Sequence, residues 1–341
     1  MKKIKVALLG GTGLVGQAFV SILTKHPFFD LTYIIASEKR EGKNYLESVK
    51  WLLPVKPTSN LNNTKIEKFN IPNLKEKGIK IIFSALPSDV AKNIEKELKD
   101  EGFYIFSNSS AFRYKNNVPI LIPEVNSEAL ELIKKQGFPH KGFIVTNANC
   151  STTGLVMALA PLKELKIKKI FVSTYQAISG AGFPGLSAME ISGNLIPYIK
   201  DEEKKIIKET NKILNSNFEI YPTCVRVPVL FGHLETVWIK FGEKEISEEN
   251  IVSLWQNFNN QNLSIPSFPE KTVVYSEEEA FPQPKLCFYG DPPGMSIFVG
   301  RLRKERDMYG FILLVNNLIR GAAGGSVLNA ELFAKRYGET L

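Results

Sequence analysis

The chain has 341 residues, of which 44% are hydrophobic and 23% charged, a composition typical of a globular protein with room for two domains. No apolar run approaches the length of a membrane span, and the run after the basic N-terminus is too short for a signal peptide. The net charge of +8 comes from lysines spread among glutamates, a pattern typical of solvated helix faces. It argues against a nucleic-acid partner, which would need a concentrated basic patch. The positive charge weakly favours anionic small substrates.

The three cysteines, Cys150, Cys224 and Cys287, are widely spaced along the chain. Their spacing matches neither a disulfide framework nor a set of metal ligands. We therefore expect no metal site, no membrane partner and a location in the reducing cytoplasm.

A buried strand is predicted at residues 4–9, followed by a glycine-rich turn and a helix that continues to about residue 25. Glycines in this turn fit the G-x-G-x-x-G dinucleotide fingerprint in its strand–turn–helix context. They allow a pyrophosphate to approach the helix N-terminus closely. The expected cofactor contacts are Gly11, Thr12, Gly13, Leu14, Val15 and Gly16.

The second strand, at residues 31–36, should end beside the adenosine ribose of the cofactor. Ser37 with Lys39 or Arg40 can hold a ribose 2′-phosphate, so the sequence favours NADP. Glu38 argues in the opposite direction, because a carboxylate here is typical of NAD-binding proteins. The alternative is that this segment is merely loop surface.

Two further strands are predicted at residues 81–86 and 104–107, with a helix between them. This alternation predicts a Rossmann-type, doubly wound parallel sheet and hence an α/β fold. Ligands bind at the carboxyl ends of such strands, so Ser84 and the segments 108–113 and 147–150 should meet near the glycine-rich turn.

Cys150 follows a strand and begins a helix-like run, where free N–H groups and the helix dipole stabilise a thiolate. The alternative is a buried cysteine that only packs. A thiolate nucleophile beside a nicotinamide cofactor suggests formation of a thioester and its reduction to an aldehyde. Asn149 or the Cys150 N–H is the candidate donor to an oxyanion.

Among the three histidines, His26 and His140 lie next to prolines and are expected in exposed loops. His233 precedes an alternating strand and is the candidate base, the alternative being a structural histidine. Arg113 and Arg226 carry planar forks suited to carboxylate or phosphate, unless each forms only a local ion pair.

A second, α+β domain is expected after the Cys150 helix, with strands at 169–178, 224–229 and 234–241 and a charged helix at 201–215. The segment from Phe311 to Tyr337 is predicted as one long helix, interrupted by Gly321, Gly324 and Gly325, which allow close packing. The expected domains are 1–150 plus a C-terminal helix at about 318–341 for the cofactor, and 151–317 for catalysis and dimerisation.

Together these motifs resemble aspartate-semialdehyde dehydrogenases, more the archaeal and fungal branch than the common bacterial one. The resemblance covers nearly the whole chain in the family's order. It is carried by residues 10–16, 107–113, 147–153, 176–182, 209–214, Arg226-Val227-Pro228 with His233, and 317–325.

The resemblance implies a role for each matching residue. Cys150 is the nucleophile, His233 the acid/base, and Gln176 orients the substrate. The substrate's charged groups are assigned to Arg226 for the α-carboxylate, Glu203 for the α-ammonium, and Arg113 and Lys205 for phosphate. Ser179, Gly180 and Asn317 fall near the nicotinamide.

The resemblance also implies the reaction, an NADPH-dependent reductive dephosphorylation of L-aspartyl-4-phosphate to L-aspartate 4-semialdehyde. This step serves lysine, threonine, methionine and isoleucine biosynthesis, in a homodimer or homotetramer built through the second domain. The first alternative is a malonyl-CoA or succinyl-CoA reductase on the same fold, and the second is a non-enzymatic dinucleotide-binding sensor.

Overall fold

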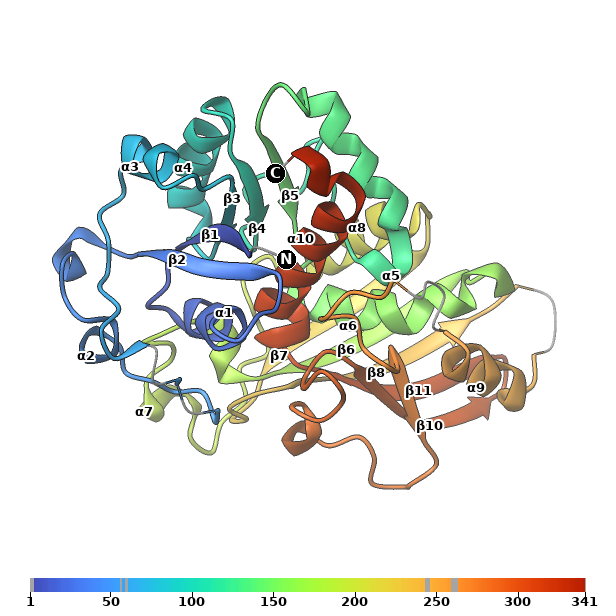
Figure 1. Cartoon of the computed structure of the whole chain (residues 1–341). Coiled ribbons are helices and arrows are strands. Elements are labelled where there is room, and N and C mark those ends of the chain that lie inside the picture. Colours follow the sequence, from blue (N-terminus) through green and yellow to red (C-terminus); the bar gives the residue numbers. More distant parts are fainter. Residues whose placement is uncertain (1–2, 56, 59–60, 243–245, 259–262, 341) are drawn as a thin grey trace. The chain divides into compact units, whose positions relative to one another are not determined.

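The computed structural model describes residues 3–55, 57–58, 61–242, 246–258 and 263–340, and its contacts divide the chain into two units (Figure 1). The first unit comprises residues 1–121, 128–147 and 322–341, and the second comprises 122–127 and 148–321. The sequence prediction ends the first domain at residue 150, whereas the contacts group Cys150 with the second unit.

Within the described residues, the first unit contains a five-stranded sheet in the order β2-β1-β3-β4-β5, and every neighbouring pair is parallel. Strands β3, β4 and β5 are buried along their whole length, as expected when both faces of a parallel sheet are covered. The predicted doubly wound sheet is confirmed. Its strands are β1 (Ile4–Leu9), β2 (Phe29–Ile35), β3 (Ile81–Ser84), β4 (Tyr104–Ser107) and β5 (Phe143–Thr146).

Helices of the first unit include one from the C-terminus of the chain, α10, where Phe333 packs against Tyr104 of β4 and Phe143 of β5 with ring centroids 5.3 and 4.9 Å away. The C-terminal segment 322–341 belongs to the first unit. The helices are α1 (Leu14–Leu23), α2 (Tyr45–Ser48), α3 (Ile71–Glu76), α4 (Ser88–Asp100) and α10 (Gly324–Tyr337).

The prediction that His26 is exposed is wrong, because its side chain is only 3% exposed. Its Nδ1 accepts the N–H groups of Phe28 and Phe29, and its Nε2 lies 2.6 Å from Glu331 of α10. Both polar atoms of the ring are therefore satisfied by protein, which permits burial. His140 is exposed as predicted.

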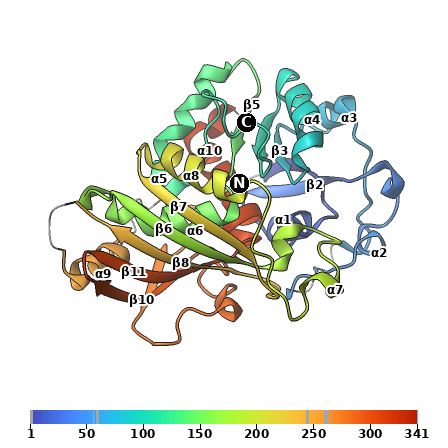
Figure 2. The ribbon, with the colours of Figure 1, turned by 180° about the vertical axis from the view of Figure 1, so that it is seen from behind.

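The second unit contains a six-stranded mixed sheet among its described residues, in the order β7-β6-β8-β11-β10-β9. Figure 2 shows β6, β7 and β8 side by side, with α6 and α8 against one face of the sheet. The strands are β6 (Lys169–Gln176), β7 (Glu219–Arg226), β8 (His233–Lys240), β9 (Val273–Ser276), β10 (Ile297–Glu305) and β11 (Met308–Val315). The helices are α5 (Pro123–Asn126), α6 (Cys150–Leu159), α7 (Ala188–Ile191), α8 (Glu202–Leu214) and α9 (Glu248–Gln256).

The single long helix predicted from Phe311 to Tyr337 is wrong. Its first part is the central strand β11, and a π-helical turn at Ile319–Ala323 leads into α10. A short continuous apolar run fits a buried strand and a buried helix equally well, so periodicity alone does not separate them. None of the helices in the described ranges is both long and apolar enough to cross a bilayer.

Candidate active site

Three polar side chains that are far apart in the sequence share one end of one sheet face in the second unit. Gln176 and Arg226 are paired at the ends of the parallel strands β6 and β7, and His233 begins the antiparallel neighbour β8. Strand alternation turns all three toward the buried face, where they are 1%, 6% and 0% exposed. The pairing of the strands thus brings together three residues that the sequence indicates only one at a time.

Cys150 is the first residue of α6, as predicted, and Asn149 caps this helix. The Asn149 Oδ1 accepts the N–H groups of Ser151 and Thr152 at 3.1 and 3.2 Å. The Cys150 Sγ therefore lies at a helix N-terminus, a position that favours a thiolate. It is 3.2 Å from Nε2 of His233.

The His233 ring is fully buried and held on both sides. Its Nδ1 accepts the N–H of Ala177 at 3.0 Å, while the carbonyl of Ala177 accepts Nη1 of Arg226 at 2.7 Å. Burial, with a smaller contribution from the Arg226 charge, lowers the pKa of His233 to about 3. The imidazole is therefore neutral at physiological pH.

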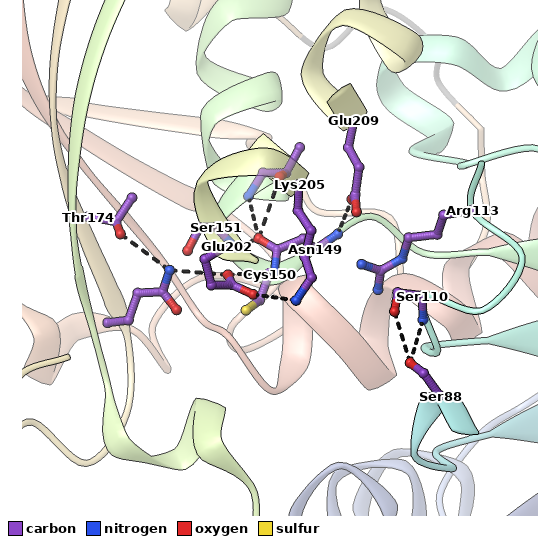
Figure 3. Close-up of polar contacts among 12 residues, drawn as sticks. Ser88, Ser110, Arg113, Asn149, Cys150, Ser151, Thr174, Glu202, Lys205 and Glu209 are labelled. Atoms are coloured by element: carbon purple, nitrogen blue, oxygen red, sulfur yellow. Dashed lines mark hydrogen bonds and ion pairs between the residues drawn. The ribbon is translucent and has the colours of Figure 1, made fainter. Parts of the chain in front are cut away.

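Glu202 of α8 is the carboxylate at this site (Figure 3). Its Oε2 accepts Nδ2 of Asn149 at 2.8 Å and Nε2 of Gln176 at 3.3 Å, and its Oε1 pairs with Lys205 at 2.8 Å. Gln176 Nε2 also donates to Thr174 at 3.2 Å, which orients the amide.

Glu203, which the sequence nominated, instead accepts the backbone N–H of Cys224 at 3.3 Å. The helical repeat indicates Glu202, because residues 202, 205 and 209 are spaced i, i+3, i+7 and therefore lie on one face of α8. Glu209 on that face accepts the N–H of Asn149 at 2.6 Å, a contact that the sequence pattern does not predict.

Asn149 was a candidate oxyanion donor, but its amide is already engaged. The Oδ1 caps α6, and the Nδ2 donates to Glu202. This arrangement suits a residue that fixes the start of α6 and the direction of the Glu202 carboxylate.

Two glycines beside Cys150 and His233 have other atoms so close that they leave no room for a side chain. A Cβ on Gly180 would lie 2.8 Å from Nη1 of Arg226 and 3.1 Å from Cε1 of His233. A Cβ on Gly321 would lie 2.7 Å from that of Cys150, which agrees with the close packing predicted there. Asn317 donates to Ser179 at 2.9 Å and accepts the N–H of Gly232 at 3.0 Å.

The glycine-rich turn of the first unit has the form that a dinucleotide requires. Gly10 has a φ of +76°, and a Cβ on Gly16 would lie 2.3 Å from the Gly10 carbonyl oxygen. Gly13 precedes α1 without any side-chain cap, so the first N–H groups of that helix are open to an anion. The residues present therefore fit a pyrophosphate at this turn.

The remaining first-unit candidates lie at the end of a strand or in the segment that follows one. Ser84 ends β3 and is completely buried, whereas Ser37 is exposed and Arg40 half-buried in a short turn after β2. Arg113 donates to the carbonyl of Asn108 at 2.8 Å, and Figure 3 shows the nearby contacts between Ser88 and Ser110.

Two protein-family models match successive parts of the chain. The family model for the semialdehyde dehydrogenase NAD binding domain matches residues 5–133, and the model for the semialdehyde dehydrogenase dimerisation domain matches residues 159–320. Aspartate-semialdehyde dehydrogenase of Archaeoglobus fulgidus is 41% identical, with 98% of each chain covered. The enzyme of that name from Saccharomyces cerevisiae is 36% identical, with the same coverage.

Two further similarities bear on the reaction. The malonyl CoA reductase (NADP) of Metallosphaera sedula is 33% identical over 98% of each chain. The crystal structure of aspartate semialdehyde dehydrogenase with NADP from Candida albicans superimposes with a TM-score of 0.87, at 31% identity, covering 98% of this chain and 99% of that one.

Proposed function

The chain belongs to the aspartate-semialdehyde dehydrogenase family, and from this premise we propose that it reduces L-aspartyl-4-phosphate to L-aspartate 4-semialdehyde with NADPH. The reaction releases inorganic phosphate and serves the biosynthesis of lysine, threonine, methionine and isoleucine. The observation that carries the proposal is the 3.2 Å approach of the Cys150 Sγ, at the start of α6, to Nε2 of His233.

Substrate recognition uses opposite charges within the second unit. Arg226 offers a buried guanidinium to the α-carboxylate, and Glu202 offers a carboxylate to the α-ammonium. Glu202 is preferred to Glu203 because it contacts Gln176 and Asn149, whereas Glu203 is occupied by a backbone N–H.

In the chemical step, the Cys150 sulfur attacks the acyl carbon of the substrate. The C–S bond forms while the bond from carbon to the phosphate oxygen breaks, and phosphate leaves with the electron pair. Lys205 and Arg113 are the cations proposed to hold that phosphate, and Gln176 orients the acyl group. Lys205 already pairs with Glu202, so it is positioned by that contact.

The glycine-rich turn would hold the cofactor at Gly11 to Gly16, with Ser37 and Arg40 at the 2′-phosphate. Bound NADPH supplies the hydride that reduces the acyl group. The resemblance assigns Ser179, Gly180 and Asn317 to the nicotinamide. Ser84, a further residue proposed for cofactor binding, is completely buried at the end of β3.

The direct test is the reverse reaction, with the semialdehyde, phosphate and either NADP or NAD. We expect turnover with NADP that depends on phosphate, and no turnover in Cys150→Ala, which should still bind NADP. Turnover retained in Cys150→Ala would contradict the role of the nucleophile.

A malonyl-CoA or succinyl-CoA reductase is the second candidate, favoured by the Metallosphaera relative. Neither CoA ester carries an ammonium group, so neither would use the Glu202 carboxylate. Reduction of malonyl-CoA by NADPH, with no activity on the semialdehyde, would favour this candidate.

For the assembly we propose a homodimer formed through the second unit, which the dimerisation-domain model matches. The outward face of β6 and β7 exposes Phe171 and Tyr221, whose rings stack with centroids 4.9 Å apart. Exposed aromatic pairs of this kind are typical of protein interfaces. The cysteine pattern supports a cytoplasmic location.

A further inference from the structure

We propose that the Glu202 carboxylate couples the binding of the two substrates by exchanging its cation: the substrate ammonium displaces Lys205 from Glu202, and Lys205 then binds phosphate. The inference rests on the proposed function, which gives the ammonium to Glu202 and the phosphate to Lys205. It adds that each substrate strengthens the binding of the other, because both use the same ion pair.

The two oxygens of the Glu202 carboxylate have different kinds of partner (Figure 3). Its Oε2 accepts Nδ2 of Asn149 at 2.8 Å and Nε2 of Gln176 at 3.3 Å, and both of these donors are neutral amides. Its Oε1 accepts the charged Nζ of Lys205 at 2.8 Å. Each carboxylate oxygen has about two lone pairs, so the two amides fill Oε2. A second cation must therefore approach Oε1, where Lys205 is bound.

The carboxylate itself is held in place. Asn149 is fixed by its own N–H, which donates to Glu209 at 2.6 Å. The Gln176 amide is fixed by Thr174, whose hydroxyl oxygen accepts Nε2 at 3.2 Å. The side chain of Glu202 is only 8% exposed. Glu202 is thus a stationary anion, and the cation on Oε1 is the part that can change.

Lys205 is the part of the ion pair that is free to move. It lies three residues after Glu202 on α8, and its side chain is 25% exposed. A lysine ammonium at the end of a flexible four-carbon stem can change its position while the helix stays where it is. Ion pairs of this spacing contribute little when they are partly exposed, so displacing Lys205 from Glu202 costs little.

The charges make the exchange favourable in both directions. A substrate ammonium on Oε1 repels the Lys205 ammonium beside it, and phosphate offers Lys205 a new partner of opposite charge. Conversely, phosphate that draws Lys205 away leaves the largely buried Glu202 charge without its cation. An uncompensated buried carboxylate attracts an ammonium group strongly. The two binding events therefore support each other.

This coupling has a signature that a merely structural role of the ion pair would not produce. Coupling between two sites is reciprocal, so an ammonium ligand should tighten phosphate by the same factor as phosphate tightens that ligand. A ligand that binds through its carboxylate alone has no group to exchange with Lys205. It should leave the affinity for phosphate unchanged.

The test is calorimetric titration of inorganic phosphate into the native full-length protein, with NADP at saturation to keep phosphate away from the glycine-rich turn. L-2-aminobutyrate carries the α-ammonium and α-carboxylate of the substrate without the aldehyde, and butyrate lacks the ammonium. We expect L-2-aminobutyrate to lower the Kd for phosphate by about 5- to 20-fold, the lower part of the range for coupled sites, and butyrate to change it by less than about twofold. Equal values of Kd with and without L-2-aminobutyrate, or the same decrease with butyrate, would overturn the proposal.

Two lysines of α8 provide matched variants. Lys205→Gln removes the cation that is exchanged, so phosphate should bind weakly and its Kd should no longer respond to L-2-aminobutyrate. Lys204 is mostly exposed and lies 3.8 Å from Asp201, so Lys204→Gln should keep the native response. A response that persists in Lys205→Gln, or that is lost in Lys204→Gln, would contradict the exchange.

The kinetics of the reverse reaction separate this inference from the proposed function. We expect the KM for phosphate to fall by a similar factor as the semialdehyde rises from below to above its own KM. Phosphate-dependent turnover with a constant KM for phosphate would overturn the exchange and leave the proposed function standing. Turnover that does not depend on phosphate would contradict the proposed function, whereas the titrations of the native protein would still decide whether the exchange occurs.

Discussion

Glu202 is the residue on which the polar contacts of the second unit converge, since Asn149, Gln176 and Lys205 all donate to it. We expect Glu202→Gln to raise KM for the semialdehyde by about 10- to 100-fold, because a hydrogen bond to a charged group contributes about 1.5–3 kcal/mol. Steady-state kinetics with NADP and phosphate in excess measure this change.

Glu203→Gln is the matched control. Its side chain would still accept the Cys224 N–H, so KM should stay within about twofold of the native value. If Glu203→Gln raises KM and Glu202→Gln does not, the original assignment from the sequence is the correct one.

Burial of Glu235 lowers the stability of the folded state by an amount that depends on pH. It is completely buried, and neither carboxyl oxygen has a hydrogen-bond partner among the described residues. Burial first, and then Glu202, raise its pKa well above the usual value, so the folded state favours the protonated form. Its contribution to stability is therefore fully present below the unfolded pKa and is lost as the pH rises through the folded pKa.

Glu235→Gln removes that titration. We expect the variant to gain Tm relative to the native protein as the pH rises from 4 to 8, with about 2–4 °C for each kcal/mol recovered. Thermal unfolding at several pH values measures the difference, with the exposed Glu278→Gln as control. A difference that is constant across this range would show that Glu235 does not titrate differently on folding.

At the scale of elements, the turn between β11 and α10 shapes the position of Cys150. Asn316 accepts the N–H groups of Leu318 and Ile319, and its carbonyl accepts that of Gly321. Arg320 makes a buried bidentate pair with Glu124, both contacts being 2.7 Å. This bonding leaves Gly321 little freedom to move away from the cysteine.

Gly321→Ala would place its Cβ 2.7 Å from that of Cys150. We expect kcat to fall by about 100-fold, the scale of a 1 Å displacement of a reacting group, and alkylation of Cys150 to slow as well. Gly338→Ala, where a Cβ meets nothing within 4 Å, should behave as the native enzyme. Native kcat in Gly321→Ala would contradict this role of the turn.

The sequence predicts the elements that depend on residues close together in the chain. It does not predict features that depend on which face of a helix is buried or on contacts with distant residues. The alternation of strands and helices predicts the parallel sheet, and the glycine-rich turn predicts the start of α1. A count along α8 selects Glu203, and a preference for Glu202 requires knowing which residues of the helix contact Asn149 and Gln176. The strand β11 looks helical because only its neighbours β8 and β10 make it a strand. The burial of His26 needs Glu331, 305 residues away.

At the scale of the whole molecule, the two units contain different parts of the proposed site. The glycine-rich turn and Arg113 belong to the first, whereas Cys150, Gln176, Arg226 and His233 belong to the second. The sheet of the second unit uses both of its faces, because strand alternation sends one set of side chains to the site and the other outward. The outward set includes the stacked rings of Phe171 and Tyr221.

That outward face yields a prediction for assembly. Phe171 and Tyr221 are 42% and 48% exposed, although aromatic side chains of this size gain from burial. Phe171→Glu would place a charge, costly to desolvate, in an apolar contact between copies. We expect it to convert a dimer into monomers at micromolar concentration, measured by light scattering after size exclusion. Met189→Glu, on the short helix α7 and almost fully exposed, should leave the dimer intact. A Phe171→Glu protein that remains dimeric would place the contact elsewhere on the second unit.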